Sequence, residues 1–381
     1  MTRALLMGVG ALLVSFAVSF LVAPLSARAA HRFGILDHPQ RGPRGHKKHK
    51  EPTPYLGGVA IFSGTLVGSA FMLAIPEGRP ALILAGFPLA IMGALALGLV
   101  GLLDDLRPLS RMVRLLVQIG AAVAAHLGGF GVSVTSLEPI NLLLSVLWIV
   151  GITNAFNLLD NMDGLTSGLA GIAALTFAAM GIIGGMPLLA VAAAALAGAS
   201  LGFLAHNRHP AKIFMGDAGS TFVGFLLALI GVRLRFDNLV EVTFLIPVVV
   251  LAIPILDTTL VVASRKLNGR PVFLGGRDHI SHRLVHVGLS VPVAVGLLYW
   301  TGLCLGWLGL VISRSTVQVG WMLLGFVIAL GLFFGGLLLR VPVYEEEFED
   351  VDDLEDAERR GGEEFITAVD NVSGEVTQVK G

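Results

Sequence analysis

The sequence predicts an all-α polytopic membrane protein, and three observations lead to this fold class. Of the 381 residues, 55% are hydrophobic and only 14% are charged. Uncharged runs repeatedly reach the roughly 20 residues that an α-helix needs to cross a bilayer. The charges are also segregated, because bases gather in a few loops and acids gather near the C-terminus. We therefore expect about eleven transmembrane helices.

The first apolar run, from Ala4 to Ser26, is followed by an Ala-Arg-Ala sequence that resembles a signal-peptide cleavage site. The apolar core of a cleaved signal usually has about 7–15 residues. This run is longer and further apolar segments follow it, so we predict a retained first transmembrane helix.

The polar loop after this helix sets the predicted orientation. It covers about residues 28–55 and holds seven Lys or Arg residues against two acids. Because cytoplasmic loops carry an excess of Lys and Arg, we place this loop in the cytoplasm and the N-terminus outside. Ten further spans are expected, at about 56–76, 81–103, 112–128, 140–158, 165–185, 187–205, 218–232, 239–263, 288–312 and 317–340. An odd number of spans puts the C-terminus in the cytoplasm, and most of the remaining basic loop residues then also fall inside.

The chain divides into a transmembrane domain, residues 1–343, and a tail, residues 344–381. Acids dominate the tail from Glu345 to Glu364, which predicts a solvated, disordered cytoplasmic appendage. The single cysteine, Cys304, excludes an intrachain disulfide framework. No internal repeat is visible, and the basic loops lack the interleaved aromatic residues that bind nucleic acid.

Four polar clusters lie at the ends of predicted spans or in the loops between them, and the predicted topology places all four on the cytoplasmic face. An ionised Asp at the centre of a spanning helix costs roughly 2.5–3.5 kcal/mol, so such groups normally face protein, water or the membrane surface. Unrelated polar groups would scatter over both faces, so this convergence predicts a single site. The clusters are Asp104-Asp105, Asn154 to Asp163, His206 to Asp217, and Asp278 to His282.

The side chains in these clusters favour a metal and phosphate site. Carboxylate and amide oxygens suit Mg²⁺, which also binds substrate phosphates, and they suit zinc less well. Asp217 follows Gly216, where the backbone of a helix N-terminus can approach a phosphate closely. His279 and His282 are three residues apart and can share a helical face. They would suit phosphate oxygens when protonated, or a metal when neutral.

The same acids also have structural explanations. Asp163 and Asp217 each precede a predicted helix, where a carboxylate can act as the N-cap. Asp104 and Asp105 point about 100° apart on a helix, so both cannot reach one ligand without fraying of the last turn.

With these residues in view, the chain resembles the polyprenyl-phosphate N-acetylhexosamine-1-phosphate transferases, the superfamily of WecA, TagO and MraY. Five motifs occur in the order that this family shows. They are Lys47-Lys-His49 followed by Pro-Thr-Pro-Tyr-Leu-Gly-Gly58, Gly101-Leu-Leu-Asp-Asp105, Asn154-Ala-Phe-Asn-Leu-Leu-Asp160 with Asp163-Gly-Leu, Lys212-Ile-Phe-Met-Gly-Asp-Ala-Gly-Ser220, and Arg277-Asp-His-Ile-Ser-His-Arg283.

The resemblance implies an enzyme of the plasma membrane that transfers a sugar 1-phosphate from a UDP-N-acetylhexosamine to a polyprenyl phosphate, with release of UMP on the cytoplasmic face. It implies Mg²⁺ as cofactor, with Mn²⁺ as an alternative ion, and it leaves a homodimer open. Residues 1–343 would then be a phosphoglycosyltransferase domain. The implied metal ligands are Asp217 and Asn157, and the implied catalytic residues are Asp104, Asp105, Asp160 and Asp163. The implied substrate contacts are Lys47, His49, Asn154, His279, His282 and Arg283.

Two positions depart from the family pattern. Ser281 stands where a typical member has a further histidine, and Asn161 stands where glycine is usual. Ser281 can still donate one hydrogen bond, and Asn161 is expected to narrow the nucleotide end of the site. The histidine-rich motif of the MraY branch is not visible, which favours a UDP-N-acetylglucosamine-like donor over the alternative, a phospho-MurNAc-pentapeptide transferase.

Two other function classes remain open at this stage. An ion-coupled transporter would also use buried acids, although transporter sites tend to lie near the bilayer midplane, between repeats. A non-catalytic lipid-phosphate binder is the third alternative, and the departures at Asn161 and Ser281 are its only support.

Overall fold

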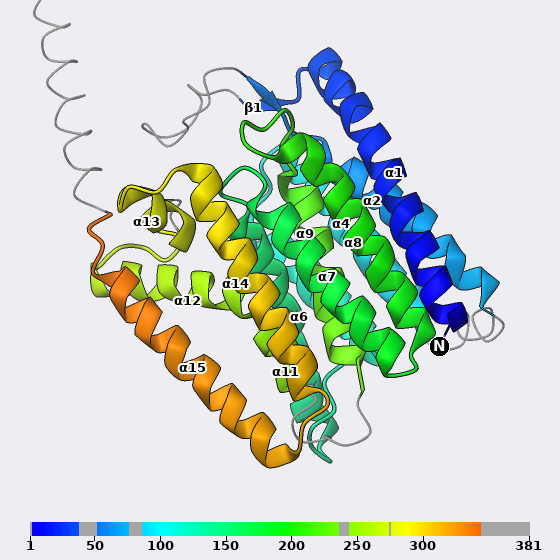
Figure 1. Cartoon of the computed structure of the whole chain (residues 1–381). Coiled ribbons are helices and arrows are strands. Elements are labelled where there is room, and N and C mark those ends of the chain that lie inside the picture. The colour runs from blue at the N-terminus through cyan, green and yellow to red at the C-terminus, as the bar shows by residue number, and fades with distance from the viewer. Residues whose placement is uncertain (1, 38–51, 76–85, 236–243, 274–275, 344–381) are drawn as a thin grey trace, which may run out of the picture.

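The computed structural model describes residues 2–37, 52–75, 86–235, 244–273 and 276–343. Within these ranges the chain is almost entirely helical (Figure 1), which confirms the predicted all-α class. The elements are α1 (Thr2–Phe33), β1 (Leu36–Asp37), β2 (Thr53–Pro54), α2 (Gly57–Ser69), the 3-10 helix η1 (Ala70–Ala74), α4 (Phe87–Leu106), α5 (Arg111–Leu127), α6 (Glu138–Leu159), α7 (Leu165–Ile183), α8 (Pro187–Asn207), α9 (Gly216–Arg233), α11 (Leu245–Val250), α12 (Ala252–Leu267), α13 (Ile280–His286), α14 (Val291–Ile312) and α15 (Val317–Leu339).

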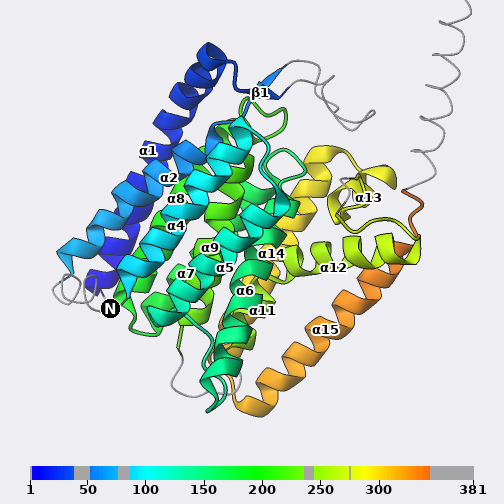
Figure 2. The same ribbon diagram turned by 180° about the vertical axis from the view of Figure 1, so that it is seen from behind.

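Helix α9 lies at the centre of the bundle. Its residues are largely buried, and it packs against α4 and α6 on one side and against α7 on the other. Figure 1 shows α7, α8 and α14 on the near side, and Figure 2 shows α4, α5 and α6 on the opposite side. Helices α1 and α2 pack on α8, while most of α15 is exposed. A helix that is apolar on all sides, as α9 is, belongs inside such a bundle.

Nine helices of the described chain are long and apolar enough to cross a membrane, whereas the sequence predicted about eleven spans. Each predicted segment does contain helix, but two segments differ from a full span. Helix α5 has only 17 residues. The segment expected at 239–263 is not one continuous helix, because it divides at Leu251 into α11 and α12.

Proline explains this division. Pro254 has no N–H to donate to the carbonyl of Val250, so a continuous helix would lack that hydrogen bond. Helix α12 then runs across the direction of α14 and α15 (Figure 1), and the mean apolar character of the segment did not reveal this turn. The predicted orientation of the two termini stays a prediction, and the acidic tail lies outside the described residues.

Close backbone contacts join the starts of α2 and α9 near the short β1–β2 pair. The N–H of Gly57 donates to Phe214 O at 3.0 Å, and the N–H of Gly58 donates to Met215 O at 2.8 Å. A Cβ on Gly58 would lie 2.5 Å from Gly219 N, so only glycine permits this approach. The N-terminus of α9 is therefore held firmly, at the same end of the bundle as α13 (Figure 1).

Candidate active site

The N-terminus of α9 is capped by a side chain from another helix. Asp105, near the end of α4, accepts hydrogen bonds from the N–H of Asp217 at 2.8 Å and from the N–H of Ala218 at 3.1 Å. The first N–H groups of a helix have no partner within the helix, and a carboxylate there also meets the positive end of the helix dipole. Gly216 has φ of +75°, and a Cβ at that residue would lie 2.5 Å from Asp105 Oδ2. Gly216 thus makes room for the carboxylate.

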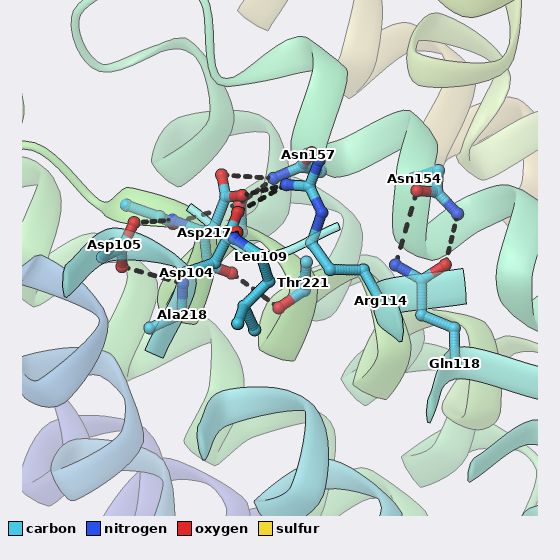
Figure 3. A network of polar contacts seen from close by, with 12 residues as sticks. Asp104, Asp105, Leu109, Arg114, Gln118, Asn154, Asn157, Asp217, Ala218 and Thr221 are labelled. Carbon is cyan, nitrogen blue, oxygen red and sulfur yellow. Dashed lines mark hydrogen bonds and ion pairs between the residues drawn. The ribbon is translucent and has the colours of Figure 1, made fainter. Parts of the chain in front are cut away.

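The adjacent residue, Asp104, points to a different partner (Figure 3). Arg114 Nη1 lies 2.5 Å from Asp104 Oδ2 and 2.8 Å from Asp217 Oδ2, so one guanidinium nitrogen bridges both carboxylates. The second oxygen of Asp104 accepts the N–H of Leu109 at 2.6 Å. The side chain of Arg114 is 33% exposed and that of Asp217 is 31% exposed, which leaves the bridge open to solvent or a ligand.

Asn157, on α6, also contacts Asp217. Its Nδ2 donates to Asp217 Oδ1 at 2.8 Å and to Ser220 Oγ at 3.0 Å. Asn154, one turn earlier on α6, contacts Gln118 instead, through an Nδ2 to Oε1 hydrogen bond of 2.6 Å. Asn157 therefore belongs to the carboxylate group, and Asn154 helps to fasten α6 to α5 (Figure 3).

The loop between α6 and α7 carries the other two acids. Asp163 Oδ2 lies 2.8 Å from His209 Nδ1 and accepts the N–H of Ala211 at 3.0 Å, so it ties this loop to the segment before α9. Asp160 is partly buried, and burial, followed by the nearby charge of Asp217, raises the pKa of Asp160 to about 7.

The structure excludes the capping alternatives for Asp163 and Asp217. The N-cap of α7 is Gly164 and that of α9 is Met215, and neither helix has a side-chain cap at that position. Asp217 lies inside the first turn of α9.

Helix α13 carries the two histidines and is held by an acid that the sequence analysis did not single out. Asp257 on α12 accepts from His279 Nδ1 and from the N–H of Ile280, both at 2.7 Å. Asp257 and His279 are buried. This contact fixes the plane of the imidazole and directs Nε2 away from Asp257. The rings of His279 and His282 lie 6.1 Å apart.

His282 is held in its neutral form. Burial, followed by the electrostatic effects of His279 and Arg277, lowers the pKa of His282 to about 4. The cationic form of His282 is therefore disfavoured at neutral pH.

Arg283 was expected to contact substrate, but its guanidinium is fully buried among protein acceptors. Nη1 donates to Leu338 O at 2.8 Å and to Val341 O at 3.0 Å, and Nη2 donates to Ser264 Oγ at 2.6 Å. These contacts join α13 to α12 and to the end of α15.

The two positions that depart from the family pattern contact each other. Ser281 Oγ donates to Asn161 Oδ1 at 2.6 Å, which links α13 to the loop after α6. With this contact, hydrogen bonds connect all four polar clusters that the sequence predicted to converge.

Three polar residues of this network were not predicted from the sequence. Arg114 and Gln118 lie in the short helix α5, and Asp257 lies in α12. Each is a polar residue inside a predicted apolar span, and the sequence alone does not show its partner. Such a residue indicates either a functional role or a partner on another helix. Lys47 and His49, both expected to contact substrate, lie outside the described residues.

The oxygen donors of this group match those that Mg²⁺ prefers. Within the described residues, no group of three or more His, Cys, Asp or Glu side chains is arranged to hold a metal. The group formed by Asp104, Asp217 and Asn157 offers two carboxylates and one amide, and two of its carboxylate oxygens already converge on the cationic Arg114. Mg²⁺ usually takes one or two carboxylates together with water and substrate phosphate, so these residues fit it.

Comparison with known proteins identifies the family. Residues 87–235 match glycosyl transferase family 4. The chain is 34% identical to a protein of Bacillus subtilis named probable undecaprenyl-phosphate N-acetylglucosaminyl 1-phosphate transferase, over 89% of this chain and 93% of that protein. It is also 34% identical to the decaprenyl-phosphate N-acetylglucosaminephosphotransferase of Mycobacterium tuberculosis, over 78% of this chain and 80% of that protein. A phospho-N-acetylmuramoyl-pentapeptide-transferase of Shouchella clausii is 32% identical over 72% of this chain and 88% of that protein. The chain therefore belongs to glycosyl transferase family 4, within the superfamily of polyprenyl-phosphate N-acetylhexosamine-1-phosphate transferases that its motifs resemble.

Proposed function

We propose that this protein transfers N-acetylglucosamine 1-phosphate from UDP-N-acetylglucosamine to a polyprenyl phosphate at the cytoplasmic face of the plasma membrane. The observation that carries the proposal is the convergence of Asp104, Asp217 and Asn157, from three separate helices, on one partly exposed point. The names of the relatives in Bacillus and Mycobacterium support N-acetylglucosamine as the sugar.

In this reaction an oxygen of the lipid phosphate forms a new bond to the phosphorus that carries the sugar. The bond from that phosphorus to the oxygen of UMP breaks, and UMP leaves with the electron pair. Phosphoryl transfer depends on positioning and on neutralising charge, and it needs little intrinsic nucleophilic chemistry from the protein.

Asp217 and Asn157 would hold Mg²⁺, with Asp104 beside them. When bound, the ion would neutralise charge on the diphosphate and orient it. Arg114 supplies a second positive group at the same point, because its guanidinium already lies between the two carboxylates. Asp104 orients the lipid phosphate or accepts its proton.

The histidines hold the phosphates from the opposite side. His279 offers Nε2 because Asp257 engages its Nδ1, and His282 gains a proton when a diphosphate brings negative charge next to it. Arg283 and Asp105 are assigned positioning roles, since both are engaged with protein partners. Asp160 and Asp163 shape the nucleotide end.

The location of the site also suits the two substrates. One is a soluble anion and the other is anchored in lipid, so their phosphates can meet only at a membrane surface. The predicted topology puts the polar ends of α4, α6 and α9 on the cytoplasmic side, where UDP-sugars are made.

An assay with purified protein in lipid nanodiscs tests the proposal. Radiolabelled UDP-N-acetylglucosamine, undecaprenyl phosphate and Mg²⁺ are supplied, and both UMP release and label in the lipid phase are measured. Wild type should transfer label, whereas Asp217→Asn and Asp104→Asn should each lose at least about 100-fold in rate, because each removes a charge at the point of transfer. Glu138→Gln, the same chemical change at the opposite, exposed end of α6, is the matched control and should keep wild-type activity.

The outcomes separate the alternatives. Transfer with UDP-MurNAc-pentapeptide but not with UDP-N-acetylglucosamine would assign the other branch of the superfamily. A transporter predicts no UMP release with either donor. A non-catalytic binder predicts association with the lipid phosphate and no turnover.

A further inference from the structure

The hydrogen bond between Asn161 and Ser281 has an unusual setting. Ser281 is completely buried, and its hydroxyl donates to Asn161 Oδ1 at 2.6 Å. The other end of the same amide, Asn161 Nδ2, donates to Leu158 O at 2.9 Å in the last turn of α6. Both ends of the amide are therefore engaged, and α13 is tied through Asn161 to the end of α6.

Other hydrogen bonds of α13 lead to different helices. His279 and Ile280 are held by Asp257 on α12. Arg283 is held by Ser264 on α12 and by carbonyls at the end of α15. Helix α13 is thus hydrogen-bonded to α12 and to the end of α15, and it also packs on α14. Ile280 lies in an apolar cluster with Leu159 and Leu165. The Asn161–Ser281 bond adds a polar contact to the loop after α6, the helix that meets Asp217.

The residues at the two ends of this bond neighbour the two groups of the candidate site. Ser281 directly precedes His282, and Asn161 directly follows Asp160 and lies four residues after Asn157. One end is therefore fixed to the histidines and the other to the helix that meets Asp217. A change in this bond alters the spacing between the two groups without touching either of them.

We propose that the Asn161–Ser281 hydrogen bond is a positioning contact that sets the spacing between the histidines of α13 and the carboxylate group of α4, α6 and α9. This inference rests on the proposed function, in which the donor diphosphate is held from both sides. The lipid phosphate is held on the carboxylate side, by Asp104. Loss of the bond should therefore weaken binding of the UDP-sugar and leave the lipid acceptor unaffected.

A double-mutant cycle measures this role. Ser281→Ala, Asn161→Ala and the double variant are compared in the transfer assay, with KM determined separately for each substrate. One hydrogen bond is worth a few-fold in an equilibrium constant, so each single variant should raise KM for UDP-N-acetylglucosamine about fivefold. The double variant should raise it no further, because both substitutions break the same bond. KM for undecaprenyl phosphate should stay within about twofold of wild type.

A control variant and two further measurements keep the result specific. Ser313→Ala removes another buried serine hydroxyl, one that bonds to Leu310 O at the far end of α14, and it should leave both KM values unchanged. Equilibrium binding of UDP-N-acetylglucosamine to each variant in nanodiscs should weaken by the same factor as KM rises. Melting temperatures establish that each variant is folded, and Asn161→Ala tests the contact from its partly exposed side if Ser281→Ala is unstable.

The results distinguish failure of this inference from failure of the proposed function. Additive effects of the two single variants, an equal rise in KM for both substrates, or no change in KM would overturn the positioning role while leaving the transfer reaction intact. A wild-type protein that transfers no sugar phosphate from any UDP-sugar would overturn the proposed function, and the positioning role with it.

Discussion

Replacing Asp257 by asparagine removes the charge that orients His279 while it keeps nearly the same shape. In the wild type, one carboxylate oxygen accepts from His279 Nδ1 and the other from the N–H of Ile280, both at 2.7 Å. The asparagine oxygen can serve only one of these donors. If it stays with Ile280, the amide N–H₂ faces Nδ1, and the imidazole must then carry its proton on Nε2. The substitution also removes the negative charge behind the ring, which favours the cationic imidazole that can donate from Nε2 to a phosphate oxygen.

The structure sets the size of the expected effect. Both side chains are buried, so water does not replace the lost contact. A hydrogen bond to a charged group contributes about 1.5–3 kcal/mol, and a loss of about 2 kcal/mol in transition-state stabilisation corresponds to roughly a 30-fold lower kcat/KM. The protein should remain folded, because the substitution leaves no unpaired buried charge behind.

The measurement is kcat/KM for UDP-N-acetylglucosamine, in the wild type and in a His279→Ala background. Asp257→Asn should lower it about 30-fold in the wild type and less than about threefold in His279→Ala, since the residue acts through His279. Thr258→Val is the matched control, because it changes the next residue and removes a buried hydroxyl without a hydrogen-bond partner in the described structure. An equal loss in both backgrounds would refute the argument that Asp257 acts by orienting His279.

Three further predictions test other parts of the site. Arg114→Gln should lower the melting temperature of the metal-free protein, because Asp104 and Asp217 then repel each other. Mg²⁺ should raise the melting temperature of this variant more than that of wild type. Equal increases would contradict the idea that Mg²⁺ and the Arg114 guanidinium occupy neighbouring positions. Gly216→Ala should lower the free energy of unfolding by about 2 kcal/mol, because the residue has φ of +75° and the new Cβ would meet Asp105 Oδ2. Gly98→Ala on α4 is the control, since no atom lies within 4 Å of the added Cβ, and it should leave the free energy of unfolding unchanged in chemical denaturation. For His282 the pKa is lowered from 6.5 to about 4 in the folded state, so the unfolded state binds more protons between these values and stability should fall as pH drops from about 6.5 to 4. His282→Gln should show a shallower fall in melting temperature over this range, and an unchanged slope would mean that His282 does not titrate as the structure implies.

The helices were predictable from sequence because apolar runs of about 20 residues have few alternatives in a membrane protein. The division at Leu251 was harder to foresee, since a run of apolar residues conceals a change of direction. Pro247 and Pro254 were the available signal, but proline also occurs inside continuous membrane helices, as Pro24 does in α1.

The site was predictable as a set of clusters but not as a set of contacts. Topology alone placed Asp104, Asn157 and Asp217 on one face, and the structure joins them through hydrogen bonds. Contacts between side chains of different helices could not be predicted, because helical periodicity relates only residues of the same helix. Asp257 lies 22 residues before His279, and only the turn between α12 and α13 brings them together. Charge likewise did not reveal that Arg283 points into the protein.

The adjacent residues Asp104 and Asp105 at the end of α4 have different roles. Asp104 lies in the candidate site, and Asp105 caps α9. Because adjacent side chains diverge by about 100°, the two carboxylates meet different partners. Asp105 holds the N–H groups of Asp217 and Ala218, 112 and 113 residues further along the chain, and so fixes where α9 begins. Asp104, one residue earlier, shares Arg114 with the side chain of the same Asp217. The distance between the carboxylates of Asp104 and Asp217 is thus set by the backbone of α4 and by a helix cap, and not by the flexible side chains alone. The proposed phosphoryl transfer would require preorganisation of this kind.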